Sequence, residues 1–273
     1  MTAQLLSLRR HLQEWATRTA NEKLLRQDQE TQLRDSLPDP KRRPQVYLAA
    51  WMLGTWRLGH GMWRVLDGDG EGFDEARTGQ ALRRCSLLLR ERHQGAAQRR
   101  AGATKLPFSR LHGAWTALLG LALGDPSADP LYELLRDEPE STFAESETMP
   151  LFVRELLALH AGQRPTLTPR LGPYQEALMH WQGDGRVFGQ RLAGLLDLHL
   201  AGTQGVGAPF DDMACKLYPV EALAVRAVRD WLELPTPKID HPLMHTNLGQ
   251  MQPTRPWPQD ELVARLEREL RKR

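Results

Sequence analysis

The spacing of the large apolar residues constrains the fold of this chain more than any other feature. Near the N-terminus, Leu5, Leu8, Leu12 and Trp15 recur at intervals of three and four, with charged residues between them. This spacing places the apolar side chains on one face of an α-helix. The alternation of apolar and polar residues that is typical of β-strands is not sustained anywhere, and Val and Ile are scarce beside Leu and Ala. The sequence therefore predicts an all-α protein.

The same pattern, interrupted by Gly and Pro, predicts about ten helices. The first begins near Leu5 and ends at Pro38 and Pro40, because Pro disfavours helix in the preceding residue. The others are expected at residues 44–66, 73–94, 109–123, 130–136, 150–160, 173–182, 187–200, 219–233 and 259–272. Their short connections favour antiparallel helix pairs in a two-layer bundle, with a long extended segment before the C-terminal helix.

Domain organisation follows from length and from breaks in this pattern. The chain of 273 residues is predicted to be a single helical domain over residues 1–273, and an alternative subdivision lies near residues 95–108. Residues 95–105 are basic and are expected to form an exposed loop. The predicted helix at residues 44–66 contains Gly54, Gly59 and Gly61, each of which costs up to about 1 kcal/mol of helix propensity. We expect them to serve a close helix approach or a kink.

Composition excludes several classes of protein. With 41% hydrophobic and 26% charged residues, the chain is neither disordered nor fibrous. Its longest apolar run, residues 117–123, is much shorter than the roughly 20 residues of a membrane-spanning helix. The two cysteines, Cys85 and Cys215, are predicted to be buried free thiols in a reducing compartment. The N-terminus lacks the apolar core of a secretory signal, so the expected location is the cytoplasm.

Charge is distributed unevenly along the chain. Residues 1–110 contain 20 Lys and Arg against 12 Asp and Glu, whereas residues 111–253 contain 10 against 18. The two parts could attract each other, present a charged face to a partner, or simply be solvated. Within the acidic part, residues 137–147 are expected to form an exposed loop that contacts a protein partner of opposite charge. Its candidate contact residues are Glu138, Glu140, Phe143, Glu145 and Glu147.

Motifs for metal or cofactor chemistry are weak. Residues 67–72 begin like a calcium-binding loop, but the position that needs a bidentate carboxylate is Thr78. His241 and His245 are four residues apart, yet Pro242 interrupts a regular helix, and the sequence does not favour zinc there. We therefore predict no metal and no cofactor.

Catalytic and nucleic-acid motifs are equally weak. The sequence contains no Gly-x-Ser-x-Gly and no phosphate-binding loop, so we predict no catalytic residue. The basic runs at residues 41–43 and 99–100 lack interleaved aromatic residues, so nucleic-acid binding is not expected.

Residues 210–253 form the most specific pattern in the sequence. An acidic pair, Asp211 and Asp212, is followed by an amphipathic helix that opens at Pro219 and then by an extended tail, in which His241-Pro242-Leu243 precedes a turn containing Gly249. This order of elements resembles the C-terminal part of the bacterial immunity proteins of polymorphic-toxin systems, in particular the all-helical immunity 49 type.

This resemblance implies a cytoplasmic, non-enzymatic protein that binds a cognate toxin domain and blocks it. Asp211, Asp212, His241 and His245 then join the acidic loop as candidate partner-binding residues. Two alternatives remain open. One is a helical enzyme whose site is assembled from the same two aspartates and two histidines. The other is a helical scaffold or regulatory protein, and the sequence leaves the oligomeric state undecided.

Overall fold

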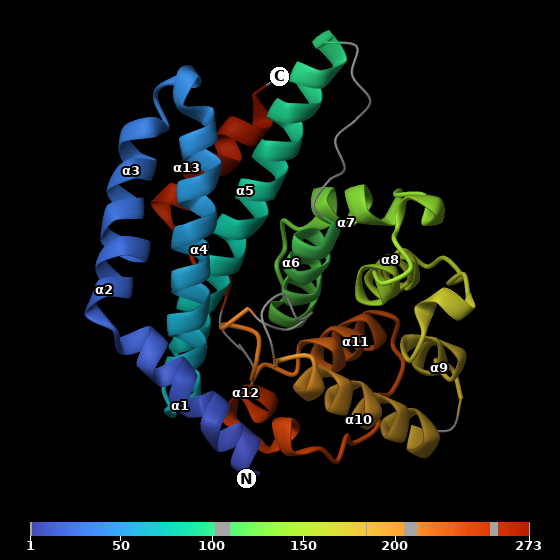
Figure 1. Cartoon of the computed structure of the whole chain (residues 1–273). Coiled ribbons are helices and arrows are strands. Elements are labelled where there is room, and N and C mark those ends of the chain that lie inside the picture. Colours follow the sequence, from blue (N-terminus) through green and yellow to red (C-terminus); the bar gives the residue numbers. More distant parts are fainter. Residues whose placement is uncertain (1, 102–109, 184, 205–211, 252–255, 273) are drawn as a thin grey trace. The chain divides into compact units, whose positions relative to one another are not determined.

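The computed structural model describes residues 2–101, 110–183, 185–204, 212–251 and 256–272, and this part of the chain is all-α (Figure 1). No strand occurs within these ranges, and ten of the helices there have seven residues or more. The predicted fold class is thus confirmed. None of the described helices is both long and apolar enough to cross a membrane.

The chain forms two compact units, which are described separately. Unit 1 comprises residues 1–8, 110–124 and 128–252, and unit 2 comprises residues 9–109, 125–127 and 253–273. The long central passage from unit 2 to unit 1 falls between Ser109 and Arg110, beside the predicted subdivision near residues 95–108. Residues 102–109 lie outside the described residues, and the single domain and the two-layer arrangement stay predictions.

Unit 2 is built from the helices at the two ends of the chain. They are α1 (Ala3–Thr17, whose first residues belong to unit 1), α2 (Thr19–Asn21), the π-helix η1 (Glu22–Gln27), α3 (Asp28–Ser36), the 3-10 helix η2 (Pro40–Arg42), α4 (Arg43–Leu66), α5 (Gly72–Ala101) and α13 (Glu261–Arg271). Apolar side chains of α3, α4, α5 and α13 form its core, with Leu53, Leu82 and Leu266 fully buried.

Two helix boundaries in unit 2 differ from prediction. The expected continuous first helix breaks at Arg18, whose backbone is extended (ψ 116°), where the Asn21 side chain donates a hydrogen bond to the Trp15 carbonyl at 2.8 Å. The loop predicted at residues 95–105 is wrong for residues 95–101, because α5 continues to Ala101. This segment is rich in Ala, Gln and Arg, which are good helix formers. Residues 102–105 lie outside the described part.

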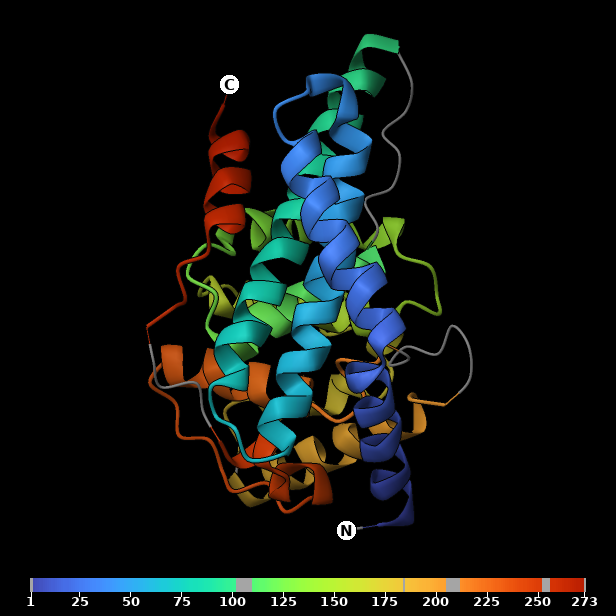
Figure 2. The same ribbon diagram turned by 90° about the vertical axis from the view of Figure 1, so that its left-hand side faces the viewer.

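Glycines bring α4 and α5 unusually close together. Gly54 and Gly61 of α4 meet Gly79 and Gly72 of α5, so the two helices run antiparallel, and both views show them side by side (Figures 1 and 2). A Cβ atom on Gly61 would lie 2.5 Å from the Gly72 carbonyl oxygen, and one on Gly79 would lie 2.5 Å from the Leu58 nitrogen. The predicted close approach is therefore confirmed for Gly54 and Gly61. Gly59 instead makes room for the Trp15 ring.

A buried ion pair links α5 to two distant segments of unit 2. The Arg84 guanidinium donates to Asp125 at 2.8 Å and to Glu267 of α13 at 2.8 Å. The side chains of Arg84 and Asp125 are 2% and 0% exposed, so neither charge has compensation from water. Removing one partner of such a pair typically costs about 3–5 kcal/mol. The contact thus ties the 125–127 segment and α13 to α5.

Unit 1 surrounds the buried helix α6 (Arg110–Leu123). Around it lie α7 (Asp129–Arg136), α8 (Thr148–His160), α9 (Tyr174–Met179), α10 (Gly185–Ala201), α11 (Val220–Trp231) and α12 (Asn247–Gln250), with the 3-10 helices η3 (Glu140–Thr142), η4 (Pro169–Leu171) and η5 (Pro242–His245). Helix α6 packs against α7, α8 and α11, and α10 packs against α9 and α11.

A second buried polar cluster holds α10, α11 and the turn before α11 together. His199 Nδ1 lies 2.8 Å from Glu221 Oε2, and His199 Nε2 lies 3.1 Å from the Cys215 carbonyl. Both side chains are 0% exposed. Both cysteines are buried free thiols, as predicted, and burial raises the pKa of Cys85 to about 12. The segment before the C-terminal helix is extended, but η5 and α12 interrupt it, which corrects the prediction of one long extended stretch.

The glycine seam gives a prediction about stability. We expect Gly61→Ala to lower the free energy of unfolding by about 1–2 kcal/mol, because the overlap with Gly72 and Ala76 outweighs the gain of up to about 1 kcal/mol in helix propensity. The matched control is Gly194→Ala in α10, where a Cβ atom meets nothing within 4 Å, and this change should stabilise by about 0.5–1 kcal/mol. Urea unfolding measures both. Equal effects of the two substitutions would contradict a close helix contact.

Candidate functional site

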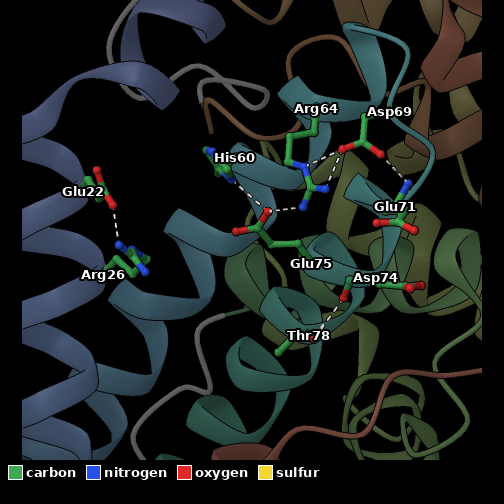
Figure 3. A network of polar contacts seen from close by, with 9 residues as sticks. All are labelled: Glu22, Arg26, His60, Arg64, Asp69, Glu71, Asp74, Glu75 and Thr78. Atoms are coloured by element: carbon green, nitrogen blue, oxygen red, sulfur yellow. Dashed lines mark hydrogen bonds and ion pairs between the residues drawn. The ribbon is translucent and has the colours of Figure 1, made fainter.

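A cavity of about 610 Å³ in unit 2 is lined mainly by polar side chains. They form three rows with helical spacing, shown in part in Figure 3: Glu22, Arg26 and Glu30 on η1 and α3, Trp56, His60 and Arg64 on α4, and Asp74, Glu75 and Thr78 on α5. Residues four apart, such as Glu22 and Arg26, Trp56 and His60, or Asp74 and Thr78, lie one helical turn apart and so face the same side, and Glu75 follows Asp74 directly. Three helical segments thus direct charged groups toward one space.

The first wall of the cavity comes from the π-helix η1. Its wider winding is rare and occurs often at functional sites. Glu22 and Arg26 form an ion pair on it, and the Arg26 guanidinium carbon lies 5.3 Å from the centre of the Trp56 ring. His60 stacks on Trp56 with ring centres 4.6 Å apart and planes inclined by 12°. Arg26, Trp56 and His60 therefore form a continuous cationic and aromatic surface.

His60 also belongs to a carboxylate–imidazole–guanidinium network with Glu75 and Arg64, which continues the lining away from Arg26 (Figure 3). Glu75 Oε2 lies 2.8 Å from His60 Nδ1 and accepts a hydrogen bond from Arg64 Nη1 at 3.3 Å. Arg64 also donates through Nε to Asp69 at 2.8 Å. Burial alone would lower the pKa of Arg64, but its bonds to Asp69 and Glu75 raise it above the ordinary value. Arg64 therefore stays charged and holds both carboxylates in place.

This network orients the His60 ring. Glu75 accepts a hydrogen bond from Arg64 and lies against His60 Nδ1, so the tautomer that donates to Glu75 carries its proton on Nδ1. In that tautomer the other ring nitrogen, Nε2, is an acceptor. An imidazole oriented by a carboxylate can accept a hydrogen bond or a proton from a group in the cavity.

Most residues of the acidic loop are exposed, as predicted, but Phe143 is not. Residues 137–147 contain the helical turn η3, and Phe143 is buried, 4% exposed, with the Arg110 guanidinium 5.4 Å from its ring centre. Arg170 donates to the carbonyls of Glu140 and Phe143. The aromatic ring thus anchors the loop to unit 1 instead of facing a partner.

The glutamates of this loop have different environments. Glu147 pairs with Arg110 at 3.1 Å and accepts from the Ala144 N–H, while Glu140 pairs with Arg170 at 3.5 Å. Glu138 is half-buried and accepts from Thr142, whereas Glu145 is exposed. Glu140 and Glu147 therefore hold the loop in its shape, and Glu145 is the member most accessible to a partner.

The predicted tail residues also have separate roles. His241 is 4% exposed, and its Nδ1 accepts a hydrogen bond from the Leu243 N–H at 3.2 Å, which caps η5, while its Nε2 lies 3.3 Å from Asp197. His245 is exposed and lies 3.3 Å from Asp240. Asp212 accepts from the Ala214 N–H within a turn, and Asp211 lies outside the described residues. In the described part of the chain, no group of three or more His, Cys, Asp or Glu side chains could hold a metal ion.

Unit 1 carries a second concavity, a groove of about 620 Å³ whose lining is more apolar than that of the cavity but also includes Gln163, Arg164 and Gln182. Its lining includes Leu159, Leu167, Met179, Trp181, Leu232 and Leu234. Leu167 and Met179 are 44% and 54% exposed, and Trp231, which precedes a lining residue, is 69% exposed. Large exposed apolar residues that gather in one place mark interaction sites.

A buried arginine fixes the shape of this groove. Arg229 donates to the carbonyls of Trp181 and Pro235 and lies 4.5 Å from the centre of the Phe188 ring. The next turn contains Glu233, the one non-glycine residue with positive φ (57°) among the described residues. Glycine usually occupies this position after a helix, and strained residues of this kind often lie at functional sites.

The sequence analysis did not predict the polar cavity, although the sequence contains a pattern that indicates it. Trp56, His60 and Arg64 repeat every four residues on a helix whose other faces are apolar, and Asp74 and Thr78 repeat in the same way. Such a polar row on a buried helix indicates a cavity or a buried network. Which rows face each other depends on the packing of three segments. The local pattern does not contain that information.

No family model, curated protein or solved structure matches the chain. The candidate site is therefore assigned on geometry alone.

The buried histidine of the tail gives a prediction about pH. Desolvation lowers the pKa of His241 despite the opposing effect of Asp197, so the unfolded chain binds the proton more readily than the folded one. His241 therefore contributes stability above about pH 6.5 that is lost as the pH falls toward its folded pKa. Replacement by Asn preserves an acceptor for the Leu243 N–H but does not titrate.

We expect His241→Asn to reduce the loss of unfolding free energy between about pH 7 and pH 5, where one such group contributes at most about 1.4 kcal/mol per pH unit. Chemical unfolding at a series of pH values measures the slopes. The same slope in His241→Asn as in the parent protein would contradict a neutral, buried His241.

Proposed function

We propose that this chain is an immunity protein that binds and neutralises a cognate secreted bacterial toxin in the cytoplasm, without catalysis. The resemblance of residues 210–253 to immunity proteins of the immunity 49 type suggests the partner. The observation that carries the proposal is the groove of unit 1 with its exposed Met179 and Leu167, together with the exposed Trp231, which precedes the lining residue Leu232. Trp and Met are enriched in protein interfaces, and Trp is the most frequent energetic anchor.

The charge of unit 1 supports a basic partner surface. The sequence places 11 Lys and Arg and 17 Asp and Glu in unit 1, a net charge of −6, whereas unit 2 contains 25 and 17, a net charge of +8. A net negative unit accelerates the approach of a positively charged protein. The groove would then supply the short-range contacts, because buried apolar area and a rigid aromatic side chain slow dissociation.

Internal contacts also fix the shape of the groove before a partner binds. Trp181 is 5% exposed and packs edge-on against Phe188 at 6.0 Å, while Arg229 holds the Trp181 carbonyl and the 235 segment. A groove whose walls are fixed loses little conformational entropy when a partner binds. The exposed Trp231 ring stacks on His160 at 5.3 Å, so this side chain is also partly ordered before binding.

The test uses the toxin domain encoded in the neighbouring reading frame. We expect the native protein to bind it and to restore growth to cells that express it, and Trp231→Ala to weaken binding by about thirtyfold, the effect of losing an anchor worth about 2 kcal/mol. The control is Leu48→Ala in unit 2, at a leucine that is 56% exposed. Binding is measured by surface plasmon resonance.

Two results would count against the proposal. A toxin domain that neither binds nor is neutralised would refute the function. Neutralisation that is unaffected by Trp231→Ala would keep the function but remove the groove from the interface. Trp231→Phe, which retains an aromatic ring, should preserve most of the affinity and so distinguishes a lost contact from a disturbed fold.

The acidic loop gives a kinetic prediction. Glu145 is exposed, and Glu138 is half-buried, so replacing both by Gln should slow association with the toxin domain at low salt and change dissociation little. The effect should be modest, because exposed pairs contribute about 0–1 kcal/mol each. Glu147→Gln is expected to act differently, since it removes the contacts with Arg110 and the Ala144 N–H and so loosens the loop. Unchanged association rates at low ionic strength would place the toxin elsewhere.

A further inference from the structure

Three atoms in the polar cavity of unit 2 are left without internal partners although their side chains are held in place. Arg26 bonds to Glu22 through Nη2 only, His60 bonds to Glu75 through Nδ1 only, and Glu75 bonds through Oε2 only. Within the described residues, Arg26 Nη1, His60 Nε2 and Glu75 Oε1 therefore make no hydrogen bond. None of the three is a buried unsatisfied atom, so they are open to the cavity.

These atoms offer two kinds of binding chemistry. Figure 3 shows Glu22 and Arg26 on one side and His60 with Glu75, Arg64 and Asp69 on the other. Arg26 Nη1 is a charged donor that suits a carboxylate. Glu75 Oε1 is a carboxylate acceptor, and His60 Nε2 is an acceptor in the tautomer that donates to Glu75 through Nδ1, so together they suit an ammonium group. Donor and acceptor groups thus face the same space from different helices.

The lining carries charged groups of both signs, which suits a ligand that also carries both. Four carboxylates line the cavity, those of Glu22, Glu30, Asp74 and Glu75, against the three guanidinium groups of Arg26, Arg57 and Arg64. A purely anionic or purely cationic ligand would leave one set of groups facing a like charge. The volume of about 610 Å³ falls within the usual range of small-molecule sites.

We propose that this cavity binds a small zwitterion, a molecule that carries a primary ammonium group and a carboxylate, such as a free amino acid. The carboxylate pairs with Arg26, and the ammonium group donates to Glu75 Oε1 and His60 Nε2. Arg64 and Asp69 are positioning residues, because they act through Glu75. This site is independent of toxin binding, which the groove of unit 1 would mediate.

The test titrates the full chain by calorimetry with the twenty protein amino acids and with the series glycine, β-alanine, 4-aminobutanoate and 6-aminohexanoate. The series varies the separation of the two charged groups and so reports the distance that the cavity accepts. We expect at least one compound to bind with a Kd of about 1 mM or lower. An amine without the carboxylate and a carboxylate without the amine, each of the same length, should bind at least about tenfold more weakly.

Two variants test which residue binds the carboxylate of the ligand and which binds its ammonium group. Arg26→Gln should weaken binding of the zwitterion at least about tenfold and leave binding of the matched amine unchanged. Glu75→Gln should weaken binding of both. The control is Arg42→Gln, at an exposed arginine of unit 2 that pairs with Asp39 away from the cavity, and it should retain the affinity within about twofold.

Circular dichroism confirms that each variant folds, and the compound series on the native chain tests the proposal even if a variant does not. Absence of binding by every zwitterion, or equal binding by the one-ended analogues, would overturn it. So would an equal loss of affinity in Arg26→Gln and Arg42→Gln.

Discussion

The glycine contact between α4 and α5 is the constraint on which the rest of unit 2 depends. Four glycines, two on each helix and seven residues apart, let the backbones meet where any side chain would overlap the facing helix. Because Gly61 faces Gly72, the neighbouring His60 and Glu75 come within hydrogen-bonding distance of each other. A wider spacing would separate the imidazole from its carboxylate. The polar cavity is therefore a consequence of the absence of side chains at the seam.

Buried charges fix the remaining elements in both units. In unit 2, Arg84 joins Asp125 and Glu267, residues far apart in the sequence, and in unit 1 His199 joins Glu221. Ion pairs of this kind contribute little net stability, because desolvation offsets their attraction. However, any packing of the helices that leaves one of these charges buried without its partner is strongly destabilised. Their effect is thus to select one packing among the many that leucine-rich helices would allow, as polar core groups do in some other proteins.

The sequence was sufficient to predict the positions of most long helices, but not the contacts that these helices make with one another. Pro, Gly and apolar periodicity placed α4, α6, α10, α11 and α13 within a few residues, because these signals act within one or two turns. The prediction that Phe143 is exposed was wrong. Its acidic neighbours in the sequence suggest a solvent-exposed loop, but Arg110 and Arg170, which are distant in the sequence, bind this loop to unit 1. The glycine approach was recognisable, because glycines in a helix lower its stability unless they serve packing. The sequence did not indicate that α5 is the helix these glycines contact.

The two concavities differ in how they would select what they bind. The groove of unit 1 exposes large apolar side chains and belongs to a unit of net charge −6, so charge acts at long range and apolar contact at short range. The cavity of unit 2 has nearly balanced charges in its lining, within a unit of net charge +8, and its groups are already held by ion pairs. A ligand there meets donors and acceptors that need no reorganisation, so recognition depends on geometry. Salt should accordingly weaken contacts at the groove chiefly by slowing the approach of the partner.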